Sequence, residues 1–178
     1  MLNVLLLGVV HEFQRQEPRF LYLPKEKIEI YLAQVRLYSR WVRAQVAGFE
    51  TQLIFDEMNL PEWEHFNRLE DFVVVPWMYM DIPENVRKIF RLTTTARSPG
   101  KEIVPEIDEP CERHWLKTIE SVSTECKLQN VVVLCGAAHL PTFSQKLIQA
   151  GFVDLTVRPS RASLELPRRG RQHGPEHR

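Results

Sequence analysis

The chain has 178 residues, 44% of them hydrophobic and 26% charged, as is usual for a globular protein. Its 23 basic and 23 acidic residues cancel, so we expect neither nucleic acid nor an anionic membrane as a partner. No apolar run approaches the roughly 20 residues that a membrane-spanning helix needs. The three cysteines lack C-x-x-C spacing and the first residues show no secretory leader pattern, which predicts a reduced, cytoplasmic protein without a disulfide framework.

The first two predicted elements are a strand and a long helix. Residues 2–7, apolar except for Asn3, form a run that ends at Gly8, which indicates a strand buried on both faces. Apolar residues then recur at spacings of three and four over residues 25–47, and Gly48 follows in the position of a C-cap. This pattern predicts an amphipathic helix over residues 25–47.

The middle of the chain is less regular. Residues 52–55 predict a second short strand, and residues 61–69 predict a short helix. The apolar stretch 72–80 contains Pro76, and since proline cannot donate to a strand ladder, a strand is expected on only one side of it. Residues 93–110 are rich in proline and turn formers and lack periodicity, which predicts a long loop.

The last third of the chain again alternates helix and strand patterns. Apolar residues share one helical face over residues 113–127, and a buried strand is expected over residues 131–135. A helix is predicted from residue 141 to residue 150 with Gly151 as its cap, and a final strand over residues 152–157.

Strands separated by helix-length segments are typical of β-α-β units with right-handed crossovers. They predict an α/β protein of three layers, in which helices cover both faces of a mostly parallel central sheet. A single domain is expected over residues 1–158. Residues 159–178 are rich in arginine and poor in large apolar side chains, which indicates a disordered or loosely docked tail; the alternative is a basic arm that contacts phosphates.

Two segments share a strand pattern followed by Gly-x-x-His. One is residues 8–11, and the other is residues 136–139. Because parallel strands present their carboxyl ends at one edge, where ligands of open α/β sheets bind, His11 and His139 are expected there together. If the two strands are neighbours, about 5 Å apart, or next neighbours, the imidazoles could share one ligand. The alternative is that the glycines are turn residues and that each histidine bonds only the backbone.

Acidic residues follow other apolar runs at the same expected edge. Asp81 comes directly after such a run, Glu57 lies two residues after the run that ends at Phe55, and Glu12 follows His11. Carboxylates there could orient a histidine tautomer, act as general bases or bind a divalent metal, for which the ligand set would be His11, Glu57 and His139. The alternatives are structural, because Asp81 stands where a helix N-cap would, and Glu12 suits an exposed helix start.

Arg113 and Cys135 are the remaining candidates. Arg113, near the start of a predicted helix, would either clamp an anionic group or form only an exposed ion pair with Glu109 or Glu112. Cys135 lies inside a buried run, which favours a small core residue over a nucleophile. The chain has no Gly-x-Ser-x-Gly, Walker, Gly-x-Gly-x-x-Gly or His-Glu-x-x-His motif, so the serine-hydrolase, P-loop and Rossmann functions lose their main support.

The paired Gly-x-x-His segments, with an acid after an intervening strand, resemble the superfamily that includes TraB-like proteins, the TIKI proteases and the erythromycin esterases. More narrowly, the chain looks like small bacterial members of that group, over about residues 2–157. The resemblance implies a crevice built from both histidines and the acids, with hydrolytic chemistry in some members. His11, His139 and Glu57 match the motif residues, and Asp81 and Arg113 match through shorter stretches. The matching segments are residues 8–12, 56–57, 81–87, 112–115 and 135–139.

Several functions are open to this sequence. The leading hypothesis is a hydrolase in which His11, His139 and Glu57 activate water, by direct proton abstraction or by holding a divalent metal. Histidine suits the proton role because its unperturbed pKa of about 6.5 lies near neutral pH. Arg113 would position an anionic or polarised group of a small-molecule or peptide substrate. The alternatives are a non-catalytic module that binds a small ligand or cofactor in the same crevice, and an interaction protein that contacts a partner through tryptophans and the basic tail.

Overall fold

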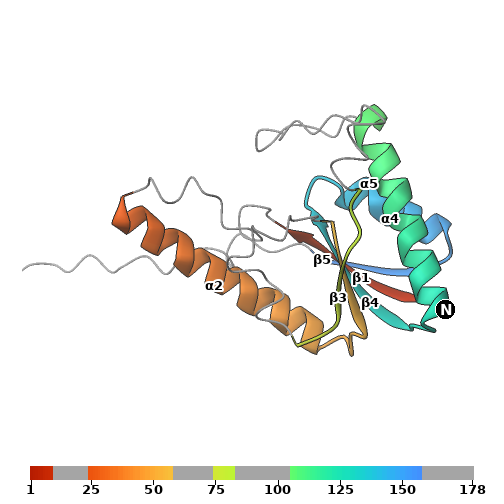
Figure 1. Ribbon diagram of the computed structural model, residues 1–178, viewed down its shortest axis with the longest axis horizontal. Helices are drawn as coiled ribbons and strands as arrows, with labels where there is room; N and C mark the ends of the chain where they lie inside the picture. The colour runs from red at the N-terminus through yellow and green to blue at the C-terminus, as the bar shows by residue number, and fades with distance from the viewer. Residues whose placement is uncertain (10–23, 58–73, 83–104, 158–178) are drawn as a thin grey trace, which may run out of the picture.

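The computed structural model describes residues 1–9, 24–57, 74–82 and 105–157 (Figure 1). The strands are β1 (Asn3–Val9), β2 (Leu53–Asp56), β3 (Trp77–Tyr79), β4 (Asn130–Gly136) and β5 (Val153–Val157). They form one five-stranded sheet in the order β3-β2-β4-β1-β5, and every neighbouring pair is parallel. The predicted α/β class with a mostly parallel sheet is confirmed.

Helices cover both faces of the sheet. The described helices are α2 (Lys25–Ala47), α4 (Pro105–Glu125) and α5 (Leu140–Gln149). Figure 1 shows α2 on one side of the sheet and α4 with α5 on the other. This arrangement gives the three layers that the alternation of strand and helix patterns predicts.

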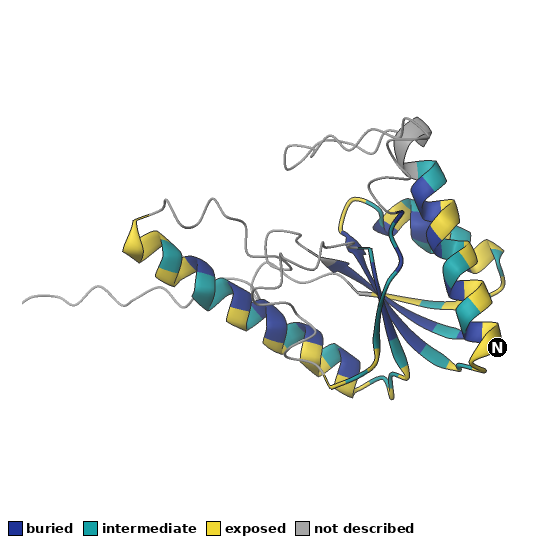
Figure 2. Ribbon diagram, in the orientation of Figure 1, coloured by how far each residue is buried: buried dark blue, intermediate teal, exposed yellow. Residues whose placement is uncertain are grey.

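The apolar runs of the central strands are explained by burial on both faces. Leu5 of β1 packs in a cluster with Tyr38 of α2, whereas Leu6 packs in a second cluster with Trp115 of α4. Side chains alternate between faces along a strand, so a strand covered on both sides must be apolar at every position. Figure 2 shows the contrast with the edge strand β5, where Leu155 is exposed.

The start of α4 corrects the predicted loop. Residues 105–110 are helical, so α4 begins eight residues before the expected start at Arg113. Pro105 is the first residue of α4, where its fixed φ suits the helix and the missing N–H has no partner in any case. Pro110 lies inside the helix, where it removes one backbone hydrogen bond. The sequence pattern predicts too short a helix, because its first residues include prolines, which are typical of turns. The buried face of α4 contains Cys111 and Trp115.

Both helices on that face end in a left-handed residue. α4 ends at Glu125 rather than at residue 127, because Lys127 has a φ of 54° and the N–H of Leu128 returns to the carbonyl of Ser123 at 2.9 Å. This is the Schellman arrangement. α5 ends in the same way at Gly151, whose φ is 85°, and its predicted role as a cap is confirmed.

Other predictions have mixed outcomes. α2 has the predicted bounds with Gly48 as its cap, and β3 lies after Pro76, whose carbonyl accepts the N–H of Ile54. The predicted helix over residues 61–69, loop residues 93–104 and the tail over residues 159–178 lie outside the described residues. No described helix combines the length and apolar character needed to cross a membrane.

Candidate functional site

The sheet order places the ends of the two Gly-x-x-His strands side by side. β1 and β4 are parallel neighbours, with Gly8 opposite Cys135 and Val9 opposite Gly136. Their carboxyl ends therefore open at the same edge, as the sequence predicts. His139 lies beyond β4, at the N-cap position of α5. The other predicted residues of this group, His11 and Glu12, lie outside the described residues.

Glu57 reaches the same edge from β2, the other neighbour of β4. Its backbone N–H donates to the carbonyl of Leu134 at 2.9 Å, and its carboxylate accepts the N–H of Gly136. The other carboxylate oxygen, Oε1, lies 3.8 Å from Nε2 of His139, and both side chains are 13% exposed. The structure thus brings together Glu57 and His139, two of the predicted site residues.

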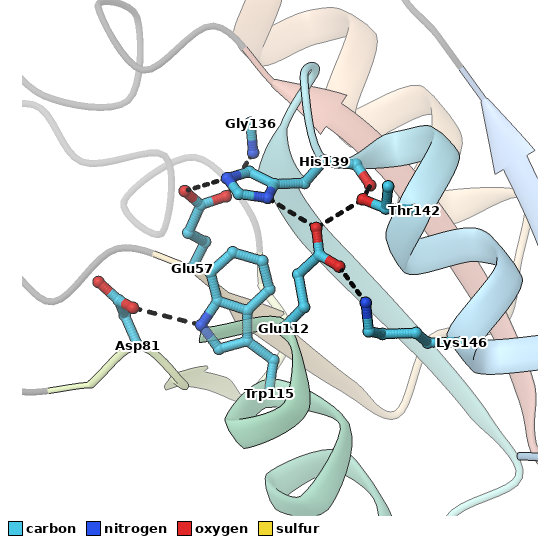
Figure 3. A network of polar contacts seen from close by, with 8 residues as sticks. All are labelled: Glu57, Asp81, Glu112, Trp115, Gly136, His139, Thr142 and Lys146. Atoms are coloured by element: carbon cyan, nitrogen blue, oxygen red, sulfur yellow. Dashed lines mark hydrogen bonds and ion pairs between the residues drawn. The ribbon is translucent and has the colours of Figure 1, made fainter. Parts of the chain in front are cut away.

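A second carboxylate, Glu112 of α4, faces the opposite nitrogen of the imidazole (Figure 3). Its Oε1 lies 2.9 Å from Nδ1 of His139 and accepts the hydroxyl of Thr142 at 2.6 Å, while its Oε2 accepts Nζ of Lys146 at 2.8 Å. The Glu112 side chain is only 1% exposed. The ring of His139 therefore lies between two carboxylates that come from different elements.

Trp115 packs against the ring of His139. Its ring meets that of His139 edge to face, with centroids 5.0 Å apart and an interplanar angle of 75°. Its Nε1 donates to Oδ1 of Asp81 at 3.2 Å. Asp81, a predicted site residue, therefore lies near the site and holds the tryptophan that packs against His139. The stretch that would test its N-cap alternative begins at residue 83, outside the described residues.

The pKa values of Glu112 and Cys135 are shifted in opposite directions. Burial acts to raise the pKa of Glu112, but hydrogen bonds from His139, Lys146 and Thr142 and the charge of Lys146 outweigh it, so this pKa is lowered. Burial, followed by the charges of Glu57 and Glu112, raises the pKa of Cys135 well above its usual range. Cys135 is a fully buried thiol, which confirms the core interpretation of that residue.

Arg113 lies away from the contacts around His139. Its side chain is 64% exposed and its Nη2 lies 2.6 Å from Oε1 of Glu109, one helical turn earlier. This is the exposed ion pair that the sequence analysis gives as the alternative to a substrate clamp. The residue of α4 that contacts His139 is instead the preceding one, Glu112.

Glu112, Thr142 and Lys146 are the contacts of this site that the sequence analysis missed. A signal was present, because Glu112 precedes the buried Trp115 by three residues and so lies in phase with the apolar face of its helix. Thr142 and Lys146 follow His139 at spacings of three and seven, which places all three on one face of α5. A carboxylate in phase with an apolar face is expected to have a buried partner.

Gly8 has a different role from the predicted tight turn. It is paired within β1, and it is not among the described glycines with positive φ. A Cβ built at this position would overlap Cδ1 of Leu140 and lie 3.1 Å from its Cγ. Leu140 directly follows His139 and is fully buried. The glycine of the first motif therefore makes room for the start of the helix that carries the histidine of the second.

The predicted metal set is only partly represented. In the described parts of the chain, no group of three or more His, Cys, Asp or Glu side chains is placed to hold a metal ion. Glu57 and His139 lie together, and the third predicted ligand, His11, is outside those parts.

Comparison with known proteins gives no relative: no family model, curated protein or solved structure matches the chain. The resemblance to the TraB-like superfamily therefore stays a prediction.

Proposed function

We propose that the protein is a hydrolase whose catalytic histidine is His139, in a crevice at the carboxyl edge of β1, β2 and β4. The observation that carries this proposal is the imidazole held between Glu57 and Glu112, with Trp115 against it. A purely structural histidine needs only a hydrogen-bond partner for each buried nitrogen. A ring held by side chains from several elements at the ligand-binding edge of an α/β sheet is typical of a general base.

The proposed reaction is the attack of water on a polarised carbonyl or similar centre of a small molecule or peptide. Nε2 of His139 takes a proton from the water, and the oxygen forms a bond to the substrate. Glu57, whose Oε1 lies 3.8 Å from that nitrogen, stabilises the imidazolium that results. The proton then passes from Nε2 to the leaving group as its bond breaks, which restores the neutral ring. His11, two residues after the last residue of β1 in the sequence, is the second histidine of this proposal.

The pair Glu57 and His139 is also compatible with a divalent metal. Nε2 of His139 and Oε1 of Glu57 are 3.8 Å apart, and two ligand bonds of about 2.1 Å each can span that separation. A carboxylate at the other nitrogen, as Glu112 supplies, is the usual partner of a metal-bound histidine. His11 would complete the set. When bound, the metal would lower the pKa of a water molecule on it.

The setting of the enzyme is part of the proposal. We place it in the cytoplasm, where thiols stay reduced, because all three cysteines are free. The balanced charge of the chain argues against nucleic acid as a substrate. Arg113 has no part in the mechanism, since it pairs with Glu109 on the exposed side of α4.

The proposal is tested with purified protein on a panel of chromogenic esters, lactones and quenched fluorescent peptides, in chelator and with added Mn²⁺ or Zn²⁺. Hydrolysis of one class is expected, with a loss of about 100-fold or more in His139→Ala and Glu57→Gln. The control Glu109→Gln changes a carboxylate of α4 that bonds only Arg113 among the contacts described above. Activity that needs added metal would identify metal-assisted hydrolysis. Wild-type protein that hydrolyses nothing under any of these conditions would refute the proposal.

A further inference from the structure

We infer that Glu112 is a positioning residue that fixes the tautomer of His139, with the hydrogen on Nδ1 and the lone pair on Nε2. The inference deepens the proposed function, because it names the nitrogen that would act. Its own test is spectroscopic and needs no substrate. A failure of the tautomer and a failure of the hydrolase proposal are therefore distinguishable.

Both carboxylate oxygens of Glu112 have hydrogen-bond donors beside them. Its Oε2 lies 2.8 Å from Nζ of Lys146, and an ammonium group has hydrogens to donate and no lone pair to accept one. Its Oε1 receives the hydroxyl hydrogen of Thr142 at 2.6 Å. A partly buried cation beside one oxygen and a donated hydrogen at the other both favour the carboxylate over the acid. Glu112 is therefore an acceptor at both oxygens.

A hydrogen bond joins Glu112 and His139. Oε1 and Nδ1 are 2.9 Å apart, a normal hydrogen-bond length, so one of them must carry a hydrogen. A carboxylate has none, which assigns the hydrogen to Nδ1. The opposite tautomer would instead place the lone pair of Nδ1 against a negative oxygen at the same distance.

Nε2 lies on the other side of the His139 ring from Glu112. A neutral imidazole carries a hydrogen on only one nitrogen, so Nε2 keeps its lone pair. This nitrogen faces Glu57 at the carboxyl edge of the sheet (Figure 3). The base of the proposed reaction is thus turned toward Glu57 by a residue buried behind it.

The assignment is tested by long-range ¹H–¹⁵N spectra of protein labelled with ¹⁵N-histidine, recorded at fixed pH values at which the protein is folded. His139→Gln identifies the signals of His139. In the wild type, Nδ1 is expected to give the shift of a protonated nitrogen and Nε2, once the ring is neutral, that of an unprotonated one. In Glu112→Gln the hydrogen is expected to move to Nε2, because Glu57 is then the carboxylate that faces the ring.

Two variants control this result. Glu109→Gln, one turn earlier on α4, should leave the tautomer unchanged. Glu57→Gln should also keep the hydrogen on Nδ1, since Glu112 remains, and this variant keeps the test decisive if Glu112→Gln does not fold. A wild-type ring with its hydrogen on Nε2, or on both nitrogens throughout, would overturn the inference. So would a Glu112→Gln protein with the wild-type tautomer, or a Glu57→Gln protein in which the hydrogen leaves Nδ1.

Discussion

The role of Gly8 leads to a prediction about packing at the site. In Gly8→Ala the new methyl group would overlap Cδ1 of Leu140 and lie 3.1 Å from its Cγ and 3.4 Å from Cα of Ala137. Leu140 is fully buried in the core cluster of α4 and α5, so it has no solvent-exposed space to turn into. The strain must therefore be taken up by the core or by the start of α5.

The magnitude follows from known costs of overpacking. An extra methyl group in a filled core typically costs about 1–3 kcal/mol, and we expect Gly8→Ala to fall in this range. Leu140→Ala alone should cost about 2–5 kcal/mol, because it leaves a cavity. In that background the methyl group of Gly8→Ala has space, so its added cost should fall below about 1 kcal/mol. The two substitutions should therefore be strongly non-additive.

Urea unfolding of the four proteins, followed by circular dichroism, measures this cycle. Gly48→Ala serves as the control, because Gly48 has a φ of −77° and its Cβ would lie no closer than 3.6 Å to another residue. That variant should stay within about 0.5 kcal/mol of the wild type. Gly8→Ala with unchanged stability, or costs that simply add in the double variant, would show that Gly8 and Leu140 are not in contact in the way described.

Three further predictions concern the site and the tail. Glu112 has a lowered pKa in the folded protein, so the stability it contributes should be complete above about pH 4.5 and lost as the pH falls through the folded value. The urea midpoints of wild type and Glu112→Gln should therefore differ at neutral pH and converge in acid; a gap that widens in acid would contradict the assignment. If His11 and His139 share one ligand, each alanine variant should abolish binding of that ligand, and the double variant should lose little more. Calorimetric melting and metal analysis check this. Additive losses of stability of about 1–3 kcal/mol with unchanged metal content would indicate two structural histidines. Truncation after residue 158 should change the melting temperature by less than about 5 °C, and a larger drop would show that the tail docks on the domain.

The sequence alone was sufficient for the class of fold. Apolar runs such as residues 131–135 have no polar face, and this is a local signature of a strand buried on both sides. The three- and four-residue spacing over residues 25–47 likewise predicts the bounds of α2. The predicted parallel sheet also implies that the strands before His11 and His139 end at one edge, because parallel strands share their direction. Such conclusions depend only on the period and composition of short segments.

The composition of the site depended on tertiary structure. Glu57 meets His139 because β2 and β4 are neighbours, and local periodicity does not encode strand order. Glu112 contacts His139 across 27 residues of chain and Lys146 across 34, so its ionised, buried state exists only when α4 packs on α5. Gly8 shows the same dependence, since the need for glycine arises from Leu140, which is far away in sequence. Local patterns specify which residues are buried, whereas the packing of distant elements decides which polar groups are buried together.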